Sequence, residues 1–163
     1  MTIASIGFGG GCHWCTEAVY SAIRGVEKVS QGFISSETPH DTFSEAVVVE
    51  FDPNRIPLVV LIEIHLRTHA STSNHKMRGK YRSAIYFTSP SQAEQARNHL
   101  AVLQGEFEEQ LVTQVLRLGD FQSSDEKFKN YYEKNTDGPF CTRYIDPKLD
   151  LLTSEFGGFV KSN

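Results

Sequence analysis

The chain has 163 residues, of which 39% are hydrophobic and 22% charged, as expected for one soluble globular domain that buries its own core. Its formal net charge of −4, without any lysine or arginine cluster, argues against binding to nucleic acid or to anionic membranes. No apolar run approaches the ~20 residues that cross a bilayer, and no basic segment precedes a long apolar one near residue 1, so we expect a cytoplasmic protein.

The N-terminal part predicts a strand, a glycine turn and a helix. Residues 3–9 are typical of a strand, and apolar residues at helical spacing follow over 12–24. Three consecutive glycines before residue 12 let the backbone turn sharply. Cys12 therefore lies at a helix N-terminus, where unpaired N–H groups and the helix dipole favour a thiolate over a thiol. Cys15 lies one turn further on the same face, within range of a disulfide.

Strands and helices alternate through the middle of the chain. A β-branched run predicts a strand over 46–51, and proline at a first helical position favours a helix of about 12 residues from Pro57. Ser89-Pro90-Ser91-Gln92 forms a capping box that precedes an apolar helical stripe. The remaining predicted elements are strands over 26–35, 81–88 and 112–118 and an ordered polar loop over 68–80.

The C-terminal part predicts one more helix and then an irregular tail. Ser123 is expected to cap a helix that continues to about residue 134. Residues 135–163 predict a tail, because Gly138-Pro139 breaks regular structure and few apolar pairs recur. This tail carries Cys141 and is expected to be mobile. The order of elements predicts one domain over residues 1–163, of α/β (α+β) class, with helices packed on a mixed sheet.

The chain contains three cysteines, Cys12, Cys15 and Cys141, too few for a secreted disulfide framework. A lone cysteine usually packs in a core, but a pair at helical spacing after a glycine turn favours redox or nucleophilic chemistry. Zinc is the main rival interpretation, since three thiols and a histidine could form a tetrahedral site, although Cys141 stands alone in the sequence. The glycines lack the last position of a dinucleotide fingerprint, so we expect no nucleotide site.

Two further residues have competing interpretations. Trp14, the only tryptophan, could pack in the core or form a rigid apolar wall for a small substrate group beside Cys12. Glu45 immediately precedes a strand, and most glutamates are simply solvated. A partly buried carboxyl group, however, keeps its proton closer to neutral pH and can act as a general acid. The residues alone do not single out Glu45 among the acidic side chains.

These motifs resemble those of the A-type peptide methionine sulfoxide reductases. The family signature Gly-Cys-Phe-Trp-Gly followed by Glu-Ala corresponds to residues 11–18, which read Gly-Cys-His-Trp-Cys-Thr-Glu-Ala. Residues 44–53 resemble the family's Ala-Glu-Ala-Val and Tyr-Asp-Pro blocks, and residues 81–86 are close to identical with its Gln-Tyr-Arg-Ser-Ala-Ile block. The resemblance extends from about residue 3 to residue 132 and implies a ferredoxin-like sandwich.

The resemblance also implies a reaction, the reduction of the S epimer of methionine sulfoxide, free or in proteins. Cys12 would attack the sulfoxide sulfur, Glu45 would protonate the departing oxygen, and Tyr81 would hydrogen-bond it. A sulfoxide oxygen leaves poorly unless it is protonated as the sulfur is attacked, so the implied roles are chemically consistent. The implied substrate-binding residues are His13, Trp14 and Phe33.

The implied cycle ends with a disulfide. Cys12 is left as a sulfenic acid, with which a second thiol condenses. The family's usual resolving cysteine corresponds to Cys141, but Cys15 is an extra thiol close to Cys12 in sequence, and we expect Cys141 to resolve first or to share the task. Thioredoxin, or dithiothreitol in the test tube, then restores the thiols of a monomer that binds no cofactor and no metal.

Three departures from the family pattern bear on substrate preference and rate. His13 replaces a phenylalanine and makes the pocket more polar, Phe33 replaces a tyrosine and removes a hydroxyl group, and Lys76 stands near a family aspartate. Two alternatives therefore stay open. One is a general Cys-x-x-Cys dithiol oxidoreductase, and the other is a non-catalytic module that binds oxidised methionine or zinc.

Overall fold

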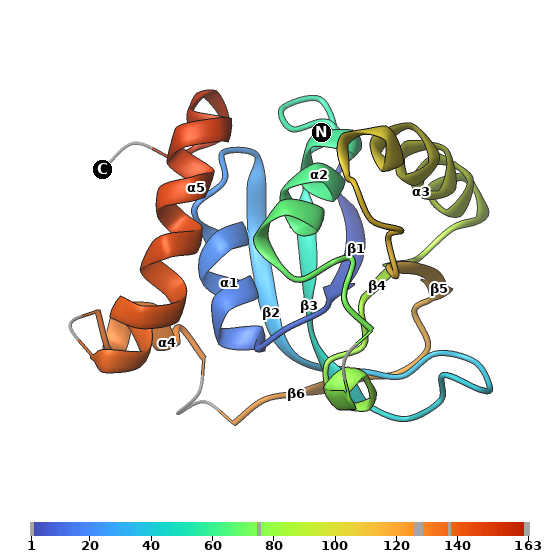
Figure 1. Cartoon of the computed structure of the whole chain (residues 1–163), viewed down its shortest axis with the longest axis horizontal. Helices are drawn as coiled ribbons and strands as arrows, with labels where there is room; N and C mark the ends of the chain where they lie inside the picture. Colours follow the sequence, from blue (N-terminus) through green and yellow to red (C-terminus); the bar gives the residue numbers. More distant parts are fainter. Residues whose placement is uncertain (1, 75, 126–128, 137, 162–163) are drawn as a thin grey trace.

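The computed structural model describes residues 2–74, 76–125, 129–136 and 138–161. Within them a six-stranded sheet has the order β5-β4-β1-β3-β2-β6, with β4 and β5 parallel and the other pairs antiparallel (Figure 1). The strands are β1 (Ala4–Gly9), β2 (Val26–Ile34), β3 (Ser44–Phe51), β4 (Ala84–Phe87), β5 (Gln114–Arg117) and β6 (Phe121–Ser123). The α+β class with a mixed sheet is confirmed.

The helices flank this sheet, and α5 runs beside α1 (Figure 1). They are α1 (His13–Ser21), α2 (Leu58–Thr68), α3 (Pro90–Leu103), α4 (Tyr131–Lys134) and α5 (Asp146–Phe156). Shorter helical turns cover Lys76–Gly79, Gln104–Glu106, Cys141–Ile145 and Gly157–Phe159. Among the helices of the described residues, none has both the length and the apolar character needed to cross a bilayer.

The main core lies between the sheet and helices α1, α2, α3 and α5, and it draws on every one of these elements. Phe8 of β1 stacks on Tyr20 of α1, with ring centroids 4.7 Å apart. The Tyr20 hydroxyl donates to the Leu61 carbonyl oxygen at 2.8 Å, so the buried polar group is satisfied and α1 is tied to α2. This packing fixes α1 against the end of β1, where the cysteine turn begins.

Most elements lie where the sequence predicts them. The helix after Pro57 is observed as α2, and Ser89 caps α3 by accepting a hydrogen bond from the Gln92 N–H at 3.2 Å. Helix α1 ends at Ser21, earlier than expected, because Ile23 forms a β-bridge with Val160. Strand β4 covers only 84–87 of the predicted 81–88.

The C-terminal predictions need two corrections. Ser123 does not cap a helix but ends β6, where it pairs with Gly32, and the nearest described helix, α4, begins at Tyr131. Residues 126–128 of the predicted helix lie outside the described residues. The prediction of an irregular tail is also wrong, because α5 packs Leu152 and Phe156 into the main core. These apolar residues recur at helical spacing, a signal that the Gly138-Pro139 break obscured.

Substituting Gly32 tests how β6 is held. A Cβ atom at Gly32 would lie 2.2 Å from the Gln122 carbonyl oxygen, so we expect Gly32→Ala to separate β6 from β2. The expected cost in free energy of unfolding is about 1–3 kcal/mol, measured in urea. Hydrogen exchange should also accelerate at the Ser124 amide, which donates to the Gln31 carbonyl oxygen at 3.1 Å.

Gly105→Ala is the matched control, because a Cβ atom at Gly105 would meet no neighbouring atom within 4 Å. We expect it to change the free energy of unfolding by less than about 0.5 kcal/mol. Equal stability and equal Ser124 exchange in the two variants would contradict the close β2–β6 approach.

Candidate active site

The turn between β1 and α1 places Cys12 at the first turn of the helix. Gly10 has φ 155°, and a Cβ atom there would lie 2.5 Å from the His69 ring, so this position requires glycine. Cys12 is the N-cap residue of α1, and its carbonyl oxygen accepts from the Cys15 N–H at 3.1 Å and the Thr16 N–H at 3.3 Å. The predicted strand-to-helix position of Cys12 is therefore correct.

Glu45 lies beside this helix terminus because β3 is the neighbour of β1. The register pairs Gly9 with Ala46, so the start of β3 meets the end of β1. Glu45 is 6% exposed, and its Oε1 accepts from the His13 backbone N–H at 3.3 Å. Its Oε2 lies 3.6 Å from the Lys80 Nζ. The sequence made Glu45 a candidate acid on the condition that its side chain is at least partly buried. The structure meets that condition.

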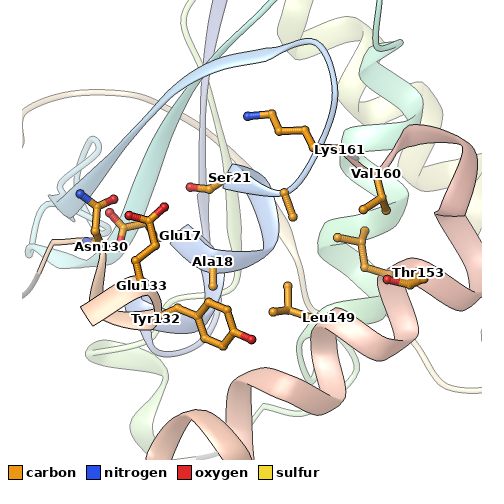
Figure 2. Close-up of a pocket in the computed structure, with 12 residues that line it drawn as sticks. Glu17, Ala18, Ser21, Asn130, Tyr132, Glu133, Leu149, Thr153, Val160 and Lys161 are labelled. Atoms are coloured by element: carbon orange, nitrogen blue, oxygen red, sulfur yellow. Dashed lines mark hydrogen bonds between the residues drawn. The ribbon is translucent and has the colours of Figure 1, made fainter. Parts of the chain in front are cut away.

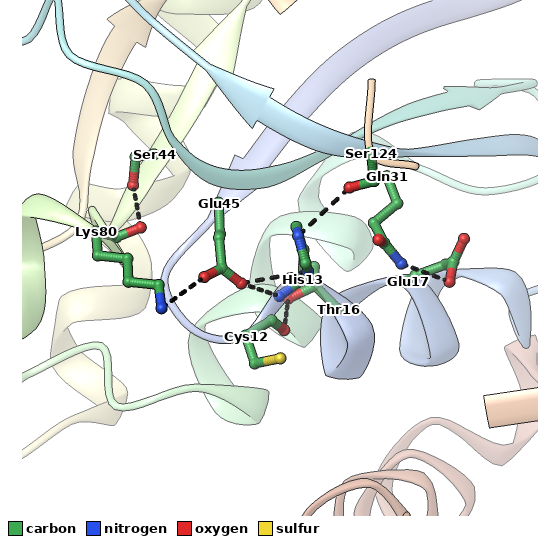
Figure 3. A network of polar contacts seen from close by, with 9 residues as sticks. All are labelled: Cys12, His13, Thr16, Glu17, Gln31, Ser44, Glu45, Lys80 and Ser124. Atoms are coloured by element: carbon green, nitrogen blue, oxygen red, sulfur yellow. Dashed lines mark hydrogen bonds and ion pairs between the residues drawn. The ribbon is translucent and has the colours of Figure 1, made fainter. Parts of the chain in front are cut away.

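His13 lies beside Cys12 and Glu45 (Figure 3). Its ring Nδ1 lies 3.2 Å from the Glu45 Oε1, and its Nε2 lies 3.4 Å from the Ser124 hydroxyl oxygen. The Cys12 sulfur, one His13 ring nitrogen and one Glu45 oxygen lie within 4.8 Å of one another. In the described residues this is the one such cluster, and it differs from the zinc set of three cysteines and a histidine that the sequence offered. It also lacks the fourth protein donor of a structural zinc site.

A cavity of about 570 Å³ opens onto this cluster. All of the sequence-predicted catalytic and substrate-binding residues line it, namely Cys12, His13, Trp14, Phe33, Glu45 and Tyr81. One apolar side is formed by Trp14, which stacks on Tyr131 with ring centroids 4.0 Å apart and meets the Phe140 ring edge-on at 5.1 Å. Sequence reasoning missed Tyr131 and Phe140, since neither belongs to a motif.

Tyr81 reaches the cavity from the segment before β4, which Arg82 anchors. Arg82 is buried, and its guanidinium donates to the carbonyl oxygens of Ile34 and Thr42, each at 3.0 Å. Arg78 adds a second anchor by donating to the Tyr81 carbonyl oxygen at 2.8 Å. Two buried or half-buried guanidinium groups thus hold the backbone at Tyr81.

The three cysteines pack together in one cluster beside the cavity. Cys15 is 6% exposed and Cys141 is 0% exposed, and both belong to one apolar cluster on which Cys12 and Trp14 also pack. The thiols of Cys12 and Cys15 are hydrogen-bonded to each other. The helical C-terminal segment carries Cys141 into this cluster, so the cysteine that stands alone in the sequence is not alone in space.

The ionisation of the thiols differs from the sequence expectation. The hydrogen bond from Cys12 lowers the pKa of Cys15, and the Lys148 ammonium lowers it further. The same hydrogen bond, together with burial, raises the pKa of Cys12. Burial raises the pKa of Cys141. The two neighbouring thiols titrate as a coupled pair, so the first negative charge belongs to the pair of Cys12 and Cys15 rather than to Cys12 alone.

A second cavity, of about 490 Å³, lies between α1, α4 and α5 and contains none of the thiols (Figure 2). Its buried acid, Glu17, has a raised pKa because of burial. The Glu17 Oε1 accepts from the Asn130 N–H at 2.8 Å and from the Gln31 side-chain amide at 2.9 Å. This carboxylate is thus engaged in holding the chain before α4 against α1.

Comparisons with known proteins agree on one family. The family model described as peptide methionine sulfoxide reductase matches residues 4–157. A peptide methionine sulfoxide reductase MsrA of Acinetobacter baumannii (strain AYE) is 32% identical over 169 residues, covering 95% of this chain and 97% of that protein. The MsrA of Pasteurella multocida (strain Pm70) is 34% identical over 156 residues, covering 87% and 90%.

Solved structures have the same fold. Methionine sulfoxide reductase A of Corynebacterium diphtheriae is 25% identical, with a TM-score of 0.70 over 83% of this chain and 76% of that one. Reduced Mxr1 from Saccharomyces cerevisiae is 21% identical, with a TM-score of 0.72 over 83% and 87%, and shows likeness of fold.

Replacing Lys148 tests the charge on the thiol pair. Lys148 lines the cavities on both sides of Cys12 and Cys15, and its ammonium donates to the Thr68 carbonyl oxygen. We expect Lys148→Met to raise the pKa of Cys15, because the thiolate loses a nearby cation. Alkylation of Cys15 near neutral pH should then slow several-fold, whereas strongly alkaline solution should abolish the difference. Tandem mass spectrometry of iodoacetamide-treated protein measures both rates.

Lys161→Met provides the control, because Lys161 is an exposed lysine that lines the cavity without thiols. Unchanged Cys15 alkylation in Lys148→Met at neutral pH would show that Lys148 does not hold the thiolate.

Proposed function

Because this chain belongs to the peptide methionine sulfoxide reductase family, we propose that its Cys12 and Glu45 reduce the S epimer of methionine sulfoxide to methionine. One observation carries the assignment of these residues. The nucleophile candidate Cys12 and the acid candidate Glu45 line one cavity, and their reactive atoms lie within 4.8 Å of each other. A thiol and a carboxyl group at this separation can act on the two ends of one S–O bond.

The reaction is balanced in protons and electrons. The Cys12 sulfur, having lost its proton, attacks the sulfoxide sulfur while Glu45 gives a proton to the oxygen. The S–O bond breaks, the hydroxyl group becomes attached to Cys12 as a sulfenic acid, and the thioether leaves. Two electrons pass from the cysteine sulfur to the substrate sulfur. The thiol proton ends on the sulfenic acid, so the step consumes no external proton.

The cavity suits a methyl sulfoxide. Trp14, backed by Tyr131 and Phe140, offers an apolar wall for the methyl group. Tyr81 lines the same cavity and is proposed to hydrogen-bond the sulfoxide oxygen. Phe33 contributes a ring without a hydroxyl group. Hydrogen bonds to the sulfoxide oxygen must therefore come from the other polar residues of the cavity.

Cys15 is the proposed resolving thiol of the first disulfide. Its thiol is already in hydrogen-bonding contact with Cys12, and its pKa is lowered, so it supplies a thiolate where the sulfenic acid forms. Cys141 is fully buried and has a raised pKa, which makes it the weaker nucleophile. Cys141 packs in the same cluster as Cys15, so it is placed for later exchange with the disulfide.

Thioredoxin is the reductant, and the cycle needs no bound cofactor. The yeast protein Mxr1, which has the same fold with a TM-score of 0.61, has been solved in complex with Trx2. A reducing compartment supplies thioredoxin and keeps Cys15 and Cys141 as thiols, which is consistent with action in the cytoplasm on free or protein-bound methionine sulfoxide.

A general dithiol oxidoreductase is the second candidate, favoured by the lowered pKa of Cys15 at the helix start. Such an enzyme exchanges disulfides through its thiols alone, so it does not need the Glu45 carboxyl group. Removing the Glu45 carboxyl group therefore distinguishes sulfoxide reduction from general disulfide exchange.

We expect Cys12→Ser to abolish turnover of the S epimer of a blocked methionine sulfoxide, because serine is a far weaker nucleophile. Glu45→Gln should reduce the rate by about 10²–10⁴-fold, as removal of a general acid does, and insulin disulfide reduction should stay negligible in wild type. The assay measures methionine formed with dithiothreitol, and the R epimer serves as control. Turnover that survives Cys12→Ser would refute the mechanism, and indifference to Glu45→Gln would favour the dithiol oxidoreductase.

The resolving thiol is identified by the disulfide that forms in a single turnover without reductant. We expect peptide mapping of wild type to show a Cys12–Cys15 bridge first. Cys15→Ser should accumulate the Cys12 sulfenic acid, trapped by dimedone, whereas Cys141→Ser should form the bridge at the wild-type rate. A first bridge from Cys12 to Cys141 would contradict this order.

A further inference from the structure

His13 is a polar residue whose chemistry the mechanism above does not use. It is 7% exposed, and its ring lies beside the Glu45 carboxyl group in the cluster that also contains Cys12. Its Nδ1 lies 3.2 Å from the Glu45 Oε1, yet it is among the buried side-chain nitrogens that make no hydrogen bond in the described residues. The Cys12 sulfur and a ring nitrogen of His13 lie within 4.8 Å of each other. An imidazole in this position lies within 4.8 Å of both groups that must exchange a proton.

The surroundings create a need for such a group. Cys12 must lose its proton to attack, but its hydrogen bond to Cys15 and its burial hold that proton. Glu45 must carry a proton when the oxygen departs, and its carboxyl group lies 3.6 Å from the Lys80 ammonium and 3.3 Å from the His13 backbone N–H. The reaction therefore has to remove a proton from the Cys12 sulfur and supply one at the Glu45 carboxyl group. The His13 ring lies within 4.8 Å of both.

We propose that Cys12, His13 and Glu45 form a proton-transfer triad, in which His13 takes the proton from the Cys12 sulfur and passes it to Glu45. This inference rests on the proposed function. The S–H bond of Cys12 breaks as an N–H bond forms, and the imidazolium returns that proton to the carboxylate. Glu45 gives it to the sulfoxide oxygen, so His13 ends neutral and the proton ends on the sulfenic acid. No further oxidant or reductant enters the step.

The Ser124 hydroxyl completes the geometry on the far side of the ring. The His13 Nε2 lies 3.4 Å from the Ser124 Oγ, and the edge of the Phe33 ring packs against the imidazole with centroids 5.3 Å apart. These contacts fix the ring plane while leaving Nδ1 toward Glu45. A hydrogen-bonded, sterically held imidazole is oriented for transfer rather than free to rotate.

Other charged and titratable groups face the triad and share in its pH dependence. Lys80 and Tyr81 lie on the segment before β4, and the exposed Asp125 follows β6 at the cavity edge. Cys15 contacts Cys12 from the next helical turn. Glu17, one helical turn beyond His13, is engaged with Asn130 and Gln31 instead. The experiment below is therefore run in a Cys15→Ser background, which removes the competing thiol.

Two substitutions separate proton transfer from hydrogen bonding and from packing. His13→Phe keeps a ring but no titratable nitrogen, and His13→Gln keeps hydrogen-bonding groups but cannot carry a proton at neutral pH. We expect each to slow methionine formation in a single turnover by about 10²-fold at saturating sulfoxide, with little change in KM. The pH profile of Cys12 alkylation should move to higher pH in both, because the sulfur loses its base.

His99→Gln is the matched control, since His99 lies in α3, away from the described cavity. It should leave both measurements unchanged. Circular dichroism and thermal unfolding show whether each variant is folded. If His13→Phe does not fold, His13→Gln alone provides the test.

Wild-type rates in both His13 variants would overturn the triad, as would an effect confined to KM, which would make His13 a substrate contact alone. Neither result touches the proposed function, which stands or falls with sulfoxide turnover by wild type and its loss in Cys12→Ser. An unshifted alkylation profile would likewise exclude His13 as the base.

Discussion

The contact between the Glu45 carboxylate and the N-terminus of α1 organises this site. A buried carboxylate is costly unless it is paired, and here the His13 N–H, the helix dipole and Lys80 offset that cost. The contact exists because β1 and β3 are neighbours in the sheet, with Gly9 opposite Ala46. The same sheet pairing therefore brings together the proposed nucleophile, after the end of β1, and the proposed acid, at the start of β3.

The C-terminal segment supplies the other half of the site. Its residues stack on Trp14 through Tyr131, add the third thiol, and bring Lys148 to the cysteine pair. This segment is held at two points, by Glu17 before α4 and by the apolar face of α5 in the main core. Helix α1 thus carries the nucleophile on its first turn and the anchor for the covering segment on its second.

Local sequence patterns predicted the sheet and the cysteine turn well because periodicity, glycine and capping residues act over a few positions. The position of Cys12 and the capping of α3 by Ser89 are of this kind. The role of Glu45 came from the family resemblance, since its burial depends on the pairing of β1 with β3, two strands far apart in the sequence, which no local pattern records. Lys148 and Tyr131 were missed for the same reason. The lowered pKa of Cys15 was also missed, because it depends on the contact between two thiols.

Cys12 lies between two cavities of different character, and this arrangement separates two kinds of chemistry. One cavity is lined by Glu45 and His13, the buried groups proposed to act on the sulfoxide oxygen. The other, about 640 Å³ in volume, is lined by Cys15, Phe140 and Tyr144 together with Lys76 and Lys148. In the proposed cycle, the disulfide between Cys12 and Cys15 is reached from this 640 Å³ cavity, where the lysine charges favour an approaching thiolate. The proposed proton donor for the sulfoxide oxygen and the proposed thiolate chemistry therefore meet Cys12 through different cavities.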